Sequence, residues 1–155
     1  MKNSICCALA LAILCGCTSA PIPKDYSGPI ATIQDWARSE DSSRAQFFYL
    51  SEIDGRKVDN ILLATRQANY GKGASNTPVT FSRQVPARAS KLKIEGRIGY
   101  GAPIQEMFHS STMYTAEATL DFTPEPNKTY VVRGVLTPNK QEVWLEEADT
   151  RKRIE

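Results

Sequence analysis

Short runs in which apolar and polar residues alternate, separated by turn-forming residues, make up most of the chain after residue 45. The run at 91–100, KLKIEGRIGY, shows the pattern most clearly, because Leu92, Ile94 and Ile98 alternate with charged residues. A period of two is typical of a β-strand with one buried and one solvated face. Similar runs occur at 47–53, 79–85, 116–122, 129–136 and 141–147.

Two turn sequences between these runs predict β-hairpins. Asp54-Gly55 is a strong hairpin dipeptide, and it predicts a return strand over residues 56–66. The four residues 137–140, TPNK, predict a second hairpin loop, which joins the last two runs.

Three further segments have weaker patterns. Residues 30–36 are predicted to form either a first edge strand or a helical turn, and residues 37–44 a polar loop. Residues 107–122 are predicted to form one long strand or a bent pair of strands. No segment predicts a helix longer than two turns. Seven or eight short strands at this spacing predict an all-β fold, an antiparallel β-sandwich.

The N-terminus has a different pattern from the rest of the chain. A single charged residue, Lys2, precedes the segment 5–14, in which every residue is apolar or cysteine. This is the organisation of a secretory signal peptide, and the apolar segment is too short to span a bilayer as a helix. The sequence therefore predicts export from the cytoplasm.

The four residues Leu14-Cys15-Gly16-Cys17 come next and resemble the lipobox of bacterial lipoproteins. This resemblance implies cleavage between Gly16 and Cys17 and lipidation of the Cys17 thiol. The alternatives are an ordinary secretory peptide and a metal-binding or redox Cys-x-Cys pair. All four cysteines lie at or before position 17, which argues against a disulfide or a cysteine-ligated metal in the cleaved chain. Thr18, after the lipidated cysteine, resembles the sorting signal for the periplasmic face of a Gram-negative outer membrane.

The predicted organisation has three parts. Residues 1–16 are the lipoprotein signal peptide, residues 17–28 a lipidated flexible tether rich in proline and small polar residues, and residues 29–155 a single β-sandwich domain. Through its DGRKV, VPAR and KLKIEG sequences, the segment 45–147 resembles the transthyretin-like or immunoglobulin-like sandwich modules of small Gram-negative lipoproteins. This resemblance implies a fold and says little about function.

Charge and motif spacing argue against several function classes. The formal net charge is +2 over 155 residues, without a clustered basic stripe, so nucleic-acid binding is not expected. The single histidine, His109, precedes Ser110, but neighbouring residues on a strand point to opposite faces and do not form a catalytic pair. Gly71-Lys72-Gly73 lacks the spacing of a phosphate-binding loop. The sequence predicts no enzyme, no metal and no other cofactor.

Two sets of charged residues are interpreted as solvated surface. Glu142 and Glu146 would lie about 13 Å apart along one strand, a separation that suits no glycosidase pair. Lys91, Lys93 and Arg97 share the polar face of the 91–100 strand. The alternative for these basic side chains is contact with anionic lipid headgroups or an acidic partner.

Three residues are candidate contacts for a partner. Trp144 in QEVWLEE is either a core residue or, if Val143 and Leu145 face the core, an exposed contact residue. Tyr70 and Lys72 lie in the segment 68–78, a predicted loop whose glycines suit positive φ angles and which could bind a ligand.

Together these features predict a non-enzymatic lipoprotein at the periplasmic face of the outer membrane that binds or scaffolds another envelope component. Confinement to a membrane would raise its effective concentration against membrane-bound partners. The alternatives are an accessory lipoprotein subunit of an envelope secretion complex, a small-ligand or glycan-binding module, and a periplasmic hydrolase.

Overall fold

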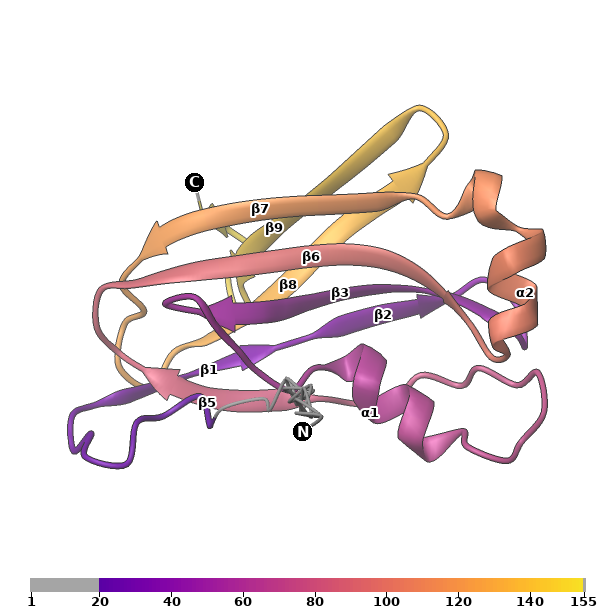
Figure 1. The fold of residues 1–155 in the computed structure, drawn as a ribbon. Coiled ribbons are helices and arrows are strands. Elements are labelled where there is room, and N and C mark those ends of the chain that lie inside the picture. The colour runs from indigo at the N-terminus through magenta and orange to yellow at the C-terminus, as the bar shows by residue number, and fades with distance from the viewer. Residues whose placement is uncertain (1–19, 155) are drawn as a thin grey trace, which may run out of the picture.

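Two β-sheets pack face to face and enclose the main hydrophobic core (Figure 1). The structure is a computed structural model, and it describes residues 20–154. Sheet A contains, in spatial order, β10 (Arg153–Ile154), β9 (Lys140–Glu147), β8 (Thr129–Thr137), β1 (Ile30–Gln34) and β5 (Ser82–Pro86). Sheet B contains β2 (Trp36–Ser39), β3 (Arg44–Ile53), β6 (Ser90–Tyr100) and β7 (Thr115–Phe122), with β4 (Arg56–Lys57) paired to β3. This architecture confirms the predicted all-β sandwich.

The strand ladders are antiparallel with one exception among the described residues. β1 runs parallel to β8 and antiparallel to β5. The strands outnumber the seven or eight expected, because β4 and β10 have only two residues each and residues 30–39 divide between two sheets.

The main core between the sheets is built by the alternation seen in the sequence. Phe48, Ile94, Val132 and Leu145 are completely buried there. Burying an apolar side chain of this size contributes about 1.5–3 kcal/mol to stability. Gly134 allows the sheets to approach closely, because a Cβ at this position would come within 2.2 Å of the Phe48 ring.

A second, smaller core lies on the outer face of sheet B, where α1 (Ile61–Ala68) packs. Ile61 and Leu62 of this helix contact Phe47 and Tyr49 of β3, so β3 is buried on both faces over most of its length. Burial raises the pKa of the Tyr49 hydroxyl, and the nearby Glu95 raises it further.

The predicted return strand over residues 56–66 is therefore wrong beyond β4. Asp54 and Gly55 both have positive φ, as the predicted hairpin requires. The strand then ends, because Asn60 caps α1 by accepting a hydrogen bond from the Leu63 N–H at 3.1 Å. Residues 61–68 bury their apolar face on sheet B as a helix.

β1 and β2 belong to different sheets although only Asp35 separates them. The buried Asp35 carboxylate forms an ion pair with Arg83 and accepts hydrogen bonds from the backbone N–H of Leu50 (3.1 Å) and Ile61 (2.9 Å). Burial raises the pKa of Asp35, and Arg83 and the two amides oppose that rise by stabilising the carboxylate. The chain thus crosses between the sheets at a side chain that is bonded to both sheets and to α1.

The strand alternative for residues 30–36 is confirmed, but its edge position is wrong, because β1 lies between β8 and β5.

The predicted polar loop over 37–44 shortens to residues 40–43, since β2 and β3 pair as a hairpin. Asp41 closes this turn by accepting hydrogen bonds from the N–H groups of Ser43 and Arg44. Its pKa is lowered by the Ser43 amide first of all.

Residues 107–122 form a strand only in their second half. α2 (Pro103–Phe108) and a 3-10 turn (Ser110–Thr112) precede β7, so neither the long strand nor the bent pair is present.

The second predicted hairpin, between β8 and β9, is confirmed, and its strands extend through Thr137 and Lys140.

The signal peptide and the lipobox, including Gly16 and Cys17, lie outside the described residues. In the described part of the predicted tether, the Tyr26 hydroxyl donates a hydrogen bond to the Pro29 carbonyl at 2.7 Å. The Arg88 guanidinium lies over the Tyr26 ring, 5.6 Å from its centroid. Among the helices of residues 20–154, none has the length and hydropathy needed to cross a membrane.

We expect Asp35→Ala to lower the free energy of unfolding by about 3–5 kcal/mol, because it leaves Arg83 buried without its charge partner. Urea unfolding followed by Trp fluorescence measures this loss. Asp149→Ala is the matched control, since Asp149 is exposed, and we expect it to change stability by no more than about 0.5 kcal/mol. Equal unfolding midpoints for the two variants would contradict the role given to Asp35.

Candidate functional site

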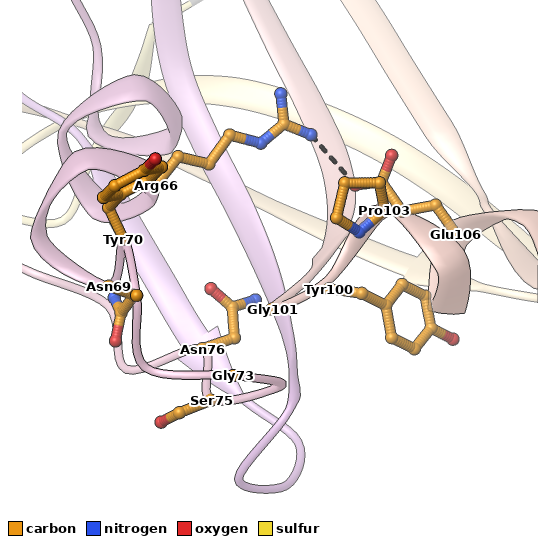
Figure 2. A pocket seen from close by; sticks show the side chains of 11 residues that line it. Arg66, Asn69, Tyr70, Gly73, Ser75, Asn76, Tyr100, Gly101, Pro103 and Glu106 are labelled. Atoms are coloured by element: carbon orange, nitrogen blue, oxygen red, sulfur yellow. Dashed lines mark hydrogen bonds and ion pairs between the residues drawn. The ribbon is translucent and has the colours of Figure 1, made fainter.

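A cleft of about 460 Å³ opens at one end of the sandwich (Figure 2). It lies where the C-terminal end of α1, the loop 69–77, the end of β6 and α2 come together. Figure 1 shows these segments at the same end of the molecule. The lining residues are Arg66, Asn69, Tyr70, Gly71, Gly73, Ser75, Asn76, Tyr100, Gly101, Pro103 and Glu106.

Two buried asparagines fix the loop that forms one wall. The Asn69 side-chain amide donates to the carbonyls of Thr65 and Thr77, both at 2.9 Å. The Asn76 amide donates to the Gly99 carbonyl of β6 at 2.8 Å. These bonds hold the loop in place, and in Asn69 they use both hydrogens of the side-chain amide.

Glycines allow this loop to turn and to approach β6. Gly71 and Gly73 have φ angles of +78° and +66°, so the predicted use of glycine at positive φ is confirmed. At Gly101 an added Cβ would lie 2.1 Å from the Ala74 carbonyl oxygen. Only glycine leaves room for this contact between the loop and the end of β6.

The opposite wall is α2, which polar contacts hold against the body. Pro103 occupies the start of the helix, where its missing N–H costs nothing. The Gln105 side chain accepts a hydrogen bond from the Ala102 N–H at 3.1 Å. Arg66 reaches across the cleft to Glu106 at 2.9 Å, the contact dashed in Figure 2, and Arg97 lies 4.0 Å from the same carboxylate.

Four large apolar side chains face solvent at this end of the molecule: Tyr70, which lines the cleft, and three residues of α2. Tyr70 is 91% exposed, Phe108 79%, Met107 73% and Ile104 54%. We refer to these four residues as the end surface. α2 has no buried residue, although it contains three of the four, so its apolar side chains do not serve the core.

A second cleft of about 510 Å³ adjoins the first and shares Tyr100 with it. His109 stacks on the Tyr100 ring with a centroid distance of 5.1 Å, and the Arg44 guanidinium lies 5.8 Å from the centroid of the same ring. Glu40 pairs with Arg44. This cleft is more polar, and its charged side chains are engaged with one another.

Of the candidate contacts predicted from the sequence, Tyr70 lines the first cleft and Lys72 lies exposed in the same loop. Trp144 lies elsewhere, on the outer face of sheet A. Val143 and Leu145 face the core, so the core alternative for Trp144 is wrong.

The Trp144 side chain already has partners within the chain. Arg153 lies over its ring, 4.8 Å from the centroid, and its indole N–H donates to Glu146 at 3.1 Å. Arg133 also pairs with Glu146, at 3.2 Å. The half-buried ring is thus covered by Arg153 and bonded at its N–H, which leaves less of it free for a partner.

The charged side chains that the sequence predicts to be solvated surface form ion pairs with neighbouring side chains. Hydrogen bonds from Lys140 and then Arg153 lower the pKa of Glu142. Lys93 lies 3.1 Å from Glu117, and the hydrogen bond between them raises the pKa of Lys93. The basic face on β6 is therefore largely neutralised by its neighbours, Lys91 lying 4.0 Å from Asp121.

His109 follows α2 instead of lying on a strand, so its expected strand geometry is wrong. It is exposed and stacks on Tyr100. Between residues 20 and 154 no group of three or more His, Cys, Asp or Glu side chains is arranged to hold a metal ion.

The α2 part of the end surface was not predicted from the sequence. The pattern predicts a strand from residue 107 onward, and Ile104 lies before that segment. The sequence does contain a helix signal here, since Pro103 follows Gly101-Ala102 and precedes Gln105 and Glu106.

The chain was compared with protein-family models, with curated proteins and with solved structures, and none of the three comparisons found a match.

Proposed function

We propose that the protein is a non-enzymatic lipoprotein that is anchored through Cys17 at the periplasmic face of a Gram-negative outer membrane and binds another envelope protein with its end surface. The lipid confines the domain to the membrane. The end surface then supplies the contact, and effective concentration makes a modest affinity sufficient.

The observation that carries this proposal is the position of the exposed apolar side chains. In the described part of the chain, the large apolar residues that are exposed are Leu63 of α1 and the four residues of the end surface. Three of these side chains lie within the six residues of α2, and exposed apolar side chains grouped in this way on a globular domain commonly mark an interaction site. Tyr, Phe and Met are also enriched at the centres of protein interfaces.

The geometry of α2 supports binding to a protein. Through Glu106, which pairs with Arg66 and lies 4.0 Å from Arg97, the helix is linked to the body of the domain, and this link lowers the cost of ordering its apolar side chains on binding. A small ligand or glycan within the cleft is supported less well, because the Asn69 side chain that lines it uses both amide hydrogens to hold the loop.

The anchor itself is tested by replacing the predicted lipidation site. We expect the wild-type protein to incorporate a labelled fatty acid and to float with outer-membrane vesicles. Cys17→Ser should lose the label and the flotation, because serine has no thiol to be lipidated. An unlabelled wild-type protein in the periplasmic fraction would contradict the lipid anchor and leave the binding surface to be tested separately.

The binding surface is tested by photo-crosslinking in living cells, with a photoreactive residue placed at Phe108. We expect a specific higher-mass band that is lost when Met107→Ser and Tyr70→Ser are added. These side chains are exposed, so each substitution should change stability by no more than about 0.5 kcal/mol.

A photoreactive residue at Gln84, which is exposed on β5, is the control and should give no such band. Equal crosslinking from positions 84 and 108 would contradict a binding role for the end surface. Survival of the band after both serine substitutions would contradict that role as well.

A further inference from the structure

β7 is an edge strand of sheet B. Its backbone pairs with β6 on one side and, within residues 20–154, with no strand on the other. Figure 1 shows β7 along the outer margin of the sheet. An edge of this kind presents unpaired N–H and C=O groups on which a further strand can be added.

The features that commonly protect an edge strand are few in β7. The strand is eight residues long and contains neither proline nor glycine. Its pairing with β6 is regular from Thr115 to Phe122. Beside it, a groove of about 330 Å³ separates β7 from β9 and β10 and is lined by Ala118, Leu120, Val143, Trp144, Arg153 and Ile154. Along this side the two sheets are thus not in full contact.

The side chains of β7 divide cleanly between two faces. Ala116, Ala118 and Leu120 face inward and are half-buried, packed against the main core. The outward side chains are exposed and alternate between threonine and an acid, namely Thr115, Glu117, Thr119 and Asp121. On the inner face, a partner strand must place side chains that fit against small apolar residues. On the outer face, it must not place acidic side chains opposite Glu117 and Asp121.

We propose that β7 pairs antiparallel with β7 of a second copy of this chain, around a two-fold axis at Ala118. Glu117 then lies opposite Thr119 of the other copy, and Thr115 lies opposite Asp121. On the inner face, Ala118 meets its own counterpart, and Ala116 lies opposite Leu120. The two B sheets join into one continuous sheet.

This register follows from the charges on the strand. A two-fold axis at Thr119 would pair the same length of strand but place Glu117 opposite Asp121, and like charges directly opposite are destabilising. An axis at Glu117 would place that acid opposite itself. With the axis at Ala118 the two strands overlap fully, and each acidic side chain lies opposite a threonine. In this register the strand is complementary to itself.

Cysteine crosslinking tests the pairing and its register together. Residues 18–155 contain no native cysteine, so a thiol introduced in β7 has no close competitor. In the proposed dimer, the Cα atoms of residue 118 lie about 4.5–5.5 Å apart, within disulfide range. Residue 119 is instead a diagonal neighbour of its counterpart, about 7–8 Å away.

We expect the full chain carrying Ala118→Cys, in excess detergent under mild oxidation, to form a disulfide-linked dimer. Thr119→Cys and the wild type should remain largely uncrosslinked. Efficient crosslinking at residue 119 in place of 118, or at neither position, would overturn the proposal. Crosslinking at both positions to the same extent would also overturn it, because it would indicate random collision.

A matched pair of charge variants gives an independent measurement. Thr119→Glu would oppose Glu117 of the other copy twice in each dimer, whereas in the monomer it lies beside Lys93 of β6. We expect it to raise the dimer dissociation constant about 2- to 30-fold, and Thr119→Lys to lower it. Sedimentation of the full chain in detergent measures both, and a shift in the same direction for the two variants, or no shift, would contradict β7 pairing.

Discussion

The buried carboxylate of Asp35 joins a strand of each sheet and the helix α1. It pairs with Arg83 of sheet A, accepts from the Leu50 amide of sheet B and accepts from the Ile61 amide at the first turn of α1. A carboxylate buried at this depth is tolerated only when such donors surround it. Together with the packing of Ile61 and Leu62 on β3, this side chain therefore positions α1 and the cleft that begins at the end of α1.

A second buried polar group fixes the sheets at the other end of their contact. The Gln46 amide donates to the Leu136 carbonyl at 3.0 Å and accepts from the Leu136 N–H at 3.3 Å, which links β3 to β8. With Asp35 it sets how the two sheets face one another. The loops and α2 project from this fixed frame, so a binding surface built on them is held in a defined shape.

Much of the fold could be predicted from the sequence, because alternation is a local property. The β6 run has its apolar residues in the core, and the Asp54-Gly55 turn has the positive φ angles it needs. The helix α1 and the sheet change at Asp35 could not be predicted in this way. The sheet change arises from contacts of Asp35 with Leu50 and Arg83, 15 and 48 residues along the chain. The helix forms because Asn60 caps it and its apolar face packs on β3, and alternation encodes neither. Of the end surface only Tyr70 is predicted from the sequence, because Met107 and Phe108 fall at the start of the segment 107–122, which is predicted to be a strand.

The most direct test of the end surface as the contact region is hydrogen–deuterium exchange. The wild-type protein would be compared in isolated outer-membrane vesicles and after purification in detergent. If a partner covers the end surface, amides at 70–76 and 103–112 exchange more slowly in the vesicles, while those of β5 exchange equally in both samples. Equal exchange at the end surface in the two samples, or slower exchange spread evenly over the domain, would contradict a contact at this surface.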